Sequence, residues 1–108
     1  MKVDILGEKY EILTIEKGNP RYNHCDGYCD ETIKTIGVKE YVQEGDVLDK
    51  GDLGKQQRKV LRHEIIHAFL FESGLADNSD WAQIEEMVDF FAIQFPKLQK
   101  AFEEAKAI

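Results

Sequence analysis

The sequence is poor in cysteine, has no cluster of basic residues and has no long apolar run. Cys25 and Cys29 are the only cysteines, too few for a disulfide scaffold, so we expect both to remain thiols. No segment approaches the length needed to span a bilayer, and charges interrupt every short apolar stretch within the first twenty residues. These absences predict a cytoplasmic protein without a signal peptide or membrane anchor.

Positive charge is also scarce, with 14 lysines and arginines against 21 acidic residues and a net charge of −7. This balance argues against a partner such as nucleic acid or an anionic membrane surface. The 108 residues are 43% apolar and 32% charged, which is typical of one globular domain with a core just large enough to fold. We therefore expect a single domain over residues 1–108.

The most informative stretch is the hexapeptide Arg62-His63-Glu64-Ile65-Ile66-His67. On a helix, His63 and His67 project from one face one turn apart, so their imidazoles can bind the same metal ion. Glu64 flanks this pair, where a carboxylate is placed to polarise a metal-bound water and not to bind the metal itself. The pattern predicts a zinc site with His63 and His67 as ligands and Glu64 as the catalytic residue.

The motif lies in a segment with helical spacing that we expect to begin after an N-cap at Asp52, span 53–72 and end at Ser73 and Gly74. The segment is apolar nearly all round, which is typical of a helix buried in a core. The apolar residues around the motif are Val60, Leu61, Ile65, Ile66, Ala68, Phe69, Leu70 and Phe71. Histidines and a glutamate in such a helix need partners, because unpaired polar groups away from water are costly.

Catalytic zinc usually has three protein ligands, so two histidines are not enough. The next helical segment offers Glu85 and Glu86. Glu85 shares a helical face with Asp89, which can accept a hydrogen bond from the second ring nitrogen of a ligand histidine, whereas Glu86 is followed one turn later by Phe90. Glu85 is therefore the preferred third ligand and Glu86 the alternative. Asp89 is either this orienting partner or a solvated helix charge.

The remaining segments predict a small antiparallel sheet and further helices. We expect a strand over 10–16 and a hairpin pairing 28–30 with 32–38, followed by a loop over 39–51. After a second loop over 75–79, Asp80 and Gln83 resemble a capping box for the glutamate-bearing helix. Pro96 should break or kink that helix, which leaves a last amphipathic helix over 98–105.

These residues resemble the gluzincins, and most closely the minigluzincins and the ImmA/IrrE-type metallopeptidase domains common in phages and mobile elements. The resemblance is carried by the histidine motif and by five residues of the following segment. These are Glu85, Asp89, Phe91, Ala92 and Pro96. It implies an α+β fold of zincin type, in which an antiparallel sheet packs against the motif helix. It also implies a peptide or protein substrate, Zn²⁺ held by His63, His67 and Glu85, and a peptide strand that pairs beside 32–38.

Two other classes of function are compatible with the sequence. The first is a catalytically silent or latent zinc-binding interaction module of the same fold, and the second is a metal-free helical domain whose histidines face solvent. If the chain is a peptidase, the oxyanion needs a further donor. Tyr22, Tyr28, Tyr41 and His24 are the candidates by chemistry.

Overall fold

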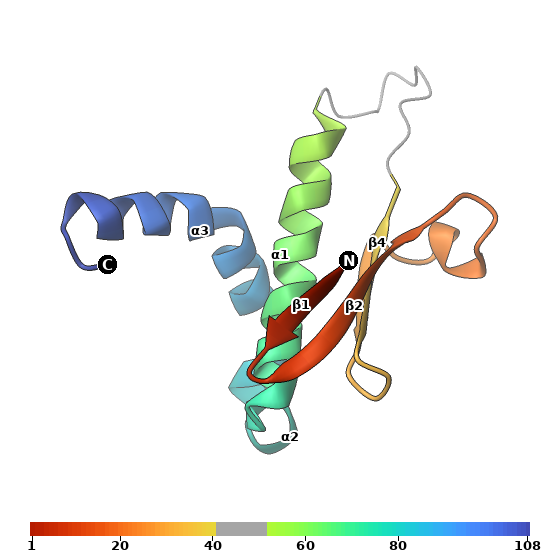
Figure 1. The fold of residues 1–108 in the computed structure, drawn as a ribbon, viewed down its shortest axis with the longest axis horizontal. Helices are drawn as coiled ribbons and strands as arrows, with labels where there is room; N and C mark the ends of the chain where they lie inside the picture. Colours follow the sequence, from red (N-terminus) through yellow and green to blue (C-terminus); the bar gives the residue numbers. More distant parts are fainter. Residues whose placement is uncertain (41–51) are drawn as a thin grey trace.

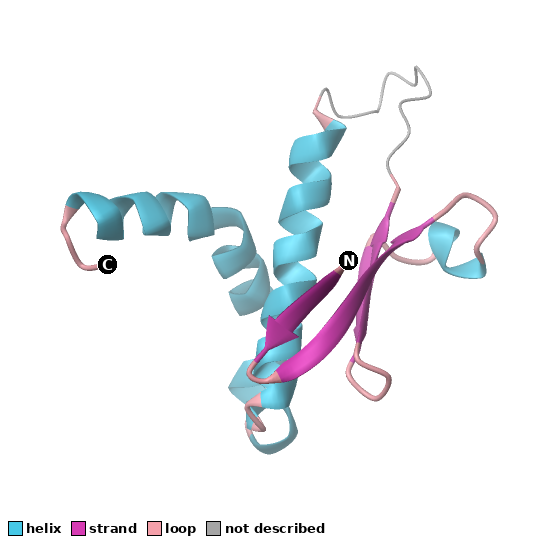
Figure 2. Cartoon of the chain, viewed as in Figure 1, coloured by secondary structure: helices cyan, strands magenta, loops and turns pink. Residues whose placement is uncertain are grey.

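The computed structural model describes residues 1–40 and 52–108 and shows an α+β fold: a four-stranded sheet followed by two long helices packed together (Figures 1 and 2). The strands are β1 (Lys2–Ile5), β2 (Glu8–Ile15), β3 (Gly27–Asp30) and β4 (Thr35–Lys39). The helices are α1 (Leu53–Glu72), α2 (Leu75–Asn78) and α3 (Glu85–Glu104), with 3₁₀ turns η1 (Pro20–Asn23) and η2 (Asp80–Gln83). The predicted loop over 39–51 falls almost entirely outside the described residues.

The sheet has the order β1-β2-β4-β3 and is mixed, so the prediction of a purely antiparallel sheet is wrong. The predicted hairpin is present as the antiparallel pair β3/β4, although β4 begins at Thr35 and not at 32. The β1/β2 pair is a second antiparallel hairpin that was not predicted, and β2 and β4 run parallel with Ile12 beside Ile36. The chain between β2 and β4 contains η1 and β3, and it returns β4 to the inside of the sheet and leaves β3 at the edge. This pairing places Tyr10 and Ile12 of β2 on the same face as Ile36 and Val38 of β4.

Helix α1 lies across that face of the sheet, and α3 packs on another side of α1 (Figure 1). The core between the sheet and α1 is small. Its buried members are Ile5, Tyr10, Ile36, Val38, Val60 and Ala68. The buried Tyr10 hydroxyl donates a hydrogen bond of 2.6 Å to Glu72 at the end of α1, and Glu72 also accepts from Lys34. These contacts fix the C-terminal end of α1 on the sheet.

The predicted bounds of α1 are confirmed. The Asp52 side chain accepts a hydrogen bond of 2.9 Å from the backbone N–H of Lys55, and Gly74 ends the helix with φ +83°. The helix is less buried than its composition predicts, since only Val60, Glu64 and Ala68 are buried. The sheet covers one side and α3 another, which leaves apolar residues on a third side half-buried or exposed.

The segment after α1 differs from the prediction in two ways. Residues 75–79 are not all loop, because α2 forms there, and the supposed capping box is the 3₁₀ turn η2, so α3 begins only at Glu85. Gln83 does not cap a helix; its side-chain amide donates to the carbonyl oxygen of Ala76. This contact joins η2 to α2 just before α3 starts.

Helix α3 continues through Pro96, so no separate last helix exists, although Figure 1 shows that the helix changes direction along its length. A proline at 96 has no N–H for the carbonyl oxygen of Ala92, one turn earlier. Arg62 Nε supplies this missing donor and lies 2.6 Å from the Ala92 oxygen. A contact from α1 thus satisfies the backbone group that the proline leaves unpaired.

Candidate metal centre

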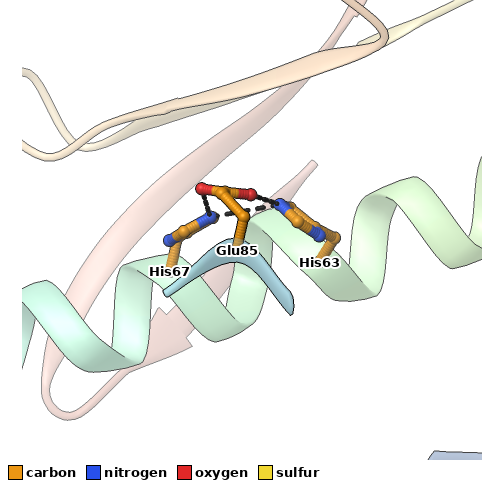
Figure 3. A group of neighbouring side chains, drawn as sticks. All are labelled: His63, His67 and Glu85. Atoms are coloured by element: carbon orange, nitrogen blue, oxygen red, sulfur yellow. Dashed lines mark hydrogen bonds and ion pairs between the residues drawn. The ribbon is translucent and has the colours of Figure 1, made fainter. Parts of the chain in front are cut away.

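Three ligand atoms converge where the first turn of α3 meets the middle of α1. His63 Nε2 and His67 Nε2 lie 3.1 Å apart, and the two carboxylate oxygens of Glu85 each lie 2.9 Å from one of them (Figure 3). This trio is the one group of potential metal ligands among the described residues. The backbone brings it together because α3 begins at Glu85, directly opposite the His63/His67 face of α1.

The size of this triangle fits a zinc ion. Zinc in proteins has bonds of about 2.0–2.2 Å to nitrogen and oxygen, so neighbouring ligands of a tetrahedral site lie roughly 3.3–3.5 Å apart. The observed separations of 2.9 to 3.1 Å are only a few tenths of an ångström shorter. Three ligands on one side leave the fourth tetrahedral position open, as catalytic zinc requires.

Asp89, one turn after Glu85, lies with Oδ1 2.8 Å from His63 Nδ1. Because a carboxylate only accepts, Nδ1 must carry the proton, which leaves Nε2 of a neutral His63 with its lone pair toward Glu85. A nitrogen lone pair and a carboxylate oxygen repel each other at 2.9 Å unless a proton or a cation lies between them. Either a proton on His63 Nε2 or a bound cation must therefore lie at this point.

The second imidazole is also suited to metal binding. Burial lowers the pKa of His67, against a smaller opposing effect of the negative charge on Glu85. A lowered pKa favours the neutral imidazole, which is the form that coordinates a metal.

Glu64 lies beside this trio on the side that faces the sheet. Its side chain is the one buried charged group among the described residues, with 7% of its surface exposed. Burial, with the negative charges of Glu85 and Asp89 and against the charge of His63, raises its pKa to about 7. A carboxylate with a pKa near neutrality can both accept and release a proton at physiological pH.

A cleft of about 230 Å³ gives access to this glutamate. Its lining comes from the start of β3, from one face of α1 and from α3. These residues are Asp26, Gly27, Gln56, Lys59, Val60, His63, Glu64 and Asp89. The motif alone does not point to Gln56 and Lys59, although their spacing before His63 places them on the same face of α1.

Gly27 permits the close approach of β3 to α1 at this cleft. A Cβ atom at position 27 would lie 2.7 Å from Val60 Cγ1 and 3.2 Å from Glu64 Cγ, nearer than packed atoms tolerate. A glycine at the start of β3 therefore lets the edge strand lie directly beside the buried carboxylate.

Tyr28, one of the candidates for the oxyanion donor, lies away from this group. Tyr28 alternates with Gly27 and Cys29 along β3, so its ring lies on the opposite face of the sheet, over Gly37 and 4.0 Å from the Arg21 guanidinium. Tyr41 lies outside the described residues. Cys29 of β3 is a free thiol, and burial, followed by the negative charge of Glu64, raises its pKa to about 12, so it stays protonated at neutral pH.

Comparisons with protein-family models, with curated proteins and with solved structures find no match to this chain, so its likeness to the zincins rests on the residues and their geometry. No helix in the described parts of the chain combines the length and apolarity needed to cross a membrane. The α+β fold and a His/His/Glu group that can hold a metal ion are the properties on which a functional assignment must be built.

Proposed function

We propose that this chain is a zinc-dependent metallopeptidase of gluzincin type, with His63, His67 and Glu85 as ligands, Glu64 as the catalytic residue and Asp89 as the orienting partner of His63. One observation carries the proposal: a buried glutamate with a pKa near 7 lies beside three ligand atoms that meet with the dimensions of a zinc site. A site that served only as a structural pin would not need a protonatable carboxylate next to its open position.

Zinc bound by these residues would lower the pKa of water from about 16 toward 7 and polarise a peptide carbonyl. Glu64 then acts as the general base that takes the proton from the attacking water, and it passes that proton to the leaving amine. Asp89 holds the imidazole of His63 in the tautomer that presents Nε2 to the metal. Burial raises the pKa of Glu64 above its ordinary value in the metal-free chain, which favours its acceptance of a proton from water.

The sheet offers a binding edge for an extended peptide, but it is not the one expected from the sequence. Strand β4 is paired on both sides, so a substrate cannot add beside it. Among the described residues, the sheet edge next to the cleft belongs to β3, whose first residue, Gly27, lies against Glu64. A substrate strand paired with β3 would be held largely by backbone hydrogen bonds, which predicts low sequence preference.

The proposal is tested by Glu64→Gln, which keeps the shape of the side chain but cannot accept a proton. We expect about one zinc per chain in both proteins by elemental analysis, and cleavage of a peptide library by the parent alone, with the parent activity abolished by a chelator. The matched control is Glu86→Gln, which removes an equal charge from the exposed surface of α3.

Equal cleavage by the parent and by Glu64→Gln would refute the role of Glu64. Zinc binding without any cleavage by the parent would instead support the silent or latent interaction module, and absence of zinc would support the metal-free domain. The three outcomes are distinguished by two measurements on the same protein samples.

A further inference from the structure

A second pocket lies next to the cleft of the metal site, between α1 and α3. Its volume is about 320 Å³, and its lining comes from the N-terminal half of α1 and from one residue of α3. These residues are Asp52, Lys55, Gln56, Lys59, Arg62 and Ile93. Because Gln56 and Lys59 also line the cleft beside Glu64, the two hollows adjoin and form one trough along α1.

This pocket gathers positive charges that are dispersed in the sequence. The chain has no contiguous basic run, but Lys55, Lys59 and Arg62 are four and three positions apart and therefore lie on one side of α1. The one acidic side chain in the lining, Asp52, accepts a hydrogen bond from the backbone N–H of Lys55 as the N-cap. Three cations against one carboxylate give this cationic pocket a net charge of +2, in a chain whose net charge is −7.

The described part of the chain does not neutralise these three cations. No carboxylate of residues 1–40 or 52–108 forms an ion pair with any of them. Arg62 is also held in place, because its Nε donates to the carbonyl oxygen of Ala92 at 2.6 Å and its terminal nitrogens remain as donors for a ligand. A guanidinium fixed in this way is well suited to bind a carboxylate through two parallel hydrogen bonds.

The stability of α1 does not account for this arrangement. Lys55 lies in the first turn, where the helix dipole disfavours a cation, and Lys59 repels it from four positions on. The first turn contains no acidic residue that would offset either effect. A bound anion would remove both costs, so the positions of these lysines favour a ligand over a role in the fold.

The trough changes sign along its length, because its acidic lining residues near β3 and α3 lie at the metal end and the cations lie at the other. The rise of 1.5 Å per helical residue puts Lys59 about 6 Å and Lys55 about 12 Å before His63 along α1. An extended peptide advances about 3.3 Å per residue. A peptide that follows α1 would therefore place side chains about two to four residues from its scissile bond beside these cations.

We propose that the cationic pocket binds acidic side chains of the substrate, so that the substrates are peptides with acidic residues about two to four positions from the scissile bond. The inference rests on the proposed function, because it takes the cleft beside Glu64 as the place of cleavage. The row of cations extends over about 10 Å from Lys55 to Arg62. Successive acidic side chains match this length, whereas the single carboxylate of a peptide C-terminus would pair with only part of it.

The test measures binding by fluorescence anisotropy with Glu64→Gln, in which the proposed catalytic base is absent. The probes are labelled peptides of about 12 residues, blocked at both ends, with three glutamates near one end, three near the other end, or glutamines in their place. We expect one of the acidic peptides to bind about 10-fold more tightly than the glutamine peptide at low salt, since three exposed ion pairs contribute about two-fold each. The difference should vanish at about 0.5 M salt, where the Debye length is about 4 Å.

A double variant, Lys55→Met with Lys59→Met, removes two of the three charges and keeps the aliphatic stems. The preference for the acidic peptide should fall to about two-fold. Arg62 is left unchanged because it also satisfies the Ala92 carbonyl. The matched control is Arg58→Met with Lys97→Met, which removes two positive charges from α1 and α3 outside the pocket and should keep the 10-fold preference.

Absence of peptide binding, equal binding of acidic and glutamine peptides, or an equal loss in the control variant would overturn the proposal. Equally tight binding of a glutamine peptide with a free C-terminus, or of a single-stranded oligonucleotide, would overturn it too, because the pocket would then recognise a lone carboxylate or phosphates.

Cleavage by the parent, measured separately, distinguishes this inference from the proposed function. A parent that cleaves neither kind of peptide while Glu64→Gln retains the binding preference would refute the peptidase and leave a site for acidic peptides. A parent that cleaves acidic and glutamine peptides equally well would refute the role of the cationic pocket alone.

Discussion

The contact between Arg62 and the carbonyl oxygen of Ala92 gives a prediction whose magnitude follows from the structure. Arg62→Met keeps the aliphatic stem and removes the donor, so the carbonyl that Pro96 leaves unpaired loses its partner. A hydrogen bond from a charged donor contributes about 1.5–3 kcal/mol. Arg62 is only half-buried, and water can reach part of the contact, so we expect a loss of about 1–2 kcal/mol in the free energy of unfolding.

Pro96→Ala restores the backbone N–H that the Ala92 oxygen lacks, so the two residues should be coupled. With alanine at 96 the helix satisfies its own carbonyl, and the cost of Arg62→Met should fall to about 0.5 kcal/mol, which leaves a coupling energy of about 1 kcal/mol. The intrinsic gain from removing a proline from a helix appears in both arms of the cycle and cancels.

The assay is urea unfolding of the metal-free protein, followed by circular dichroism, for the parent, the two single variants and the double variant. A chelator is needed throughout, because zinc that binds only the folded state would add its own stabilisation. Lys55→Met, on the same helix, controls for the loss of one positive charge from an acidic chain. If Arg62→Met costs the same with proline and with alanine at 96, the role assigned to the guanidinium is wrong.

Three further predictions concern the metal site and the stability of the fold. Glu85→Gln should weaken zinc binding far more than Glu86→Gln in a competition assay with a chromogenic chelator, because only Glu85 lies between the histidines; equal effects would place the third ligand elsewhere. Asp89→Asn should weaken zinc binding by about 10-fold and Asp89→Ala by up to about 100-fold. Asparagine keeps a hydrogen-bond acceptor for His63 Nδ1 but lacks the negative charge of aspartate, whereas alanine keeps neither. Unchanged zinc binding in both variants would make Asp89 an ordinary surface charge. The pKa of Glu72 lies below its ordinary 4.5, and the hydrogen bond from Lys34 is the largest cause. The ionised Glu72 therefore stabilises the fold above pH 4.5, and this contribution is lost as the pH falls through the pKa of the folded state. Lys34→Met should therefore flatten the acid side of a stability profile measured by urea unfolding, and an unchanged slope would contradict this reading.

The parts of the fold that depend on neighbours in the sequence could be predicted. The cap at Asp52, the end of α1 at Gly74 and the bounds between them follow from local chemistry. The same holds for the geometry of the candidate metal site. The spacing of His63 and His67 places both on one face of α1, and the position of Asp89 one turn after Glu85 favours Glu85 over Glu86. Such spacing survives in any context in which both segments are helical.

The parts of the fold that depend on contacts between distant segments could not be predicted from the sequence. Nothing local to Ile12 or Ile36 shows that their strands run parallel, because this is decided by where the β3/β4 hairpin docks. A proline at 96 predicts the end of a helix until Arg62, 34 positions earlier in the sequence, is seen to satisfy the carbonyl it frees. A proline inside a helix is costly because it leaves a carbonyl oxygen without a donor, and here the contact from Arg62 removes that cost.

The three sides of α1 explain why a helix with two histidines and a glutamate is apolar nearly all round. The sheet side buries Glu64 and raises its pKa, and the α3 side brings Glu85 to both imidazoles, so two sides are occupied by the chain itself. The third side has the composition of a buried surface and is half open.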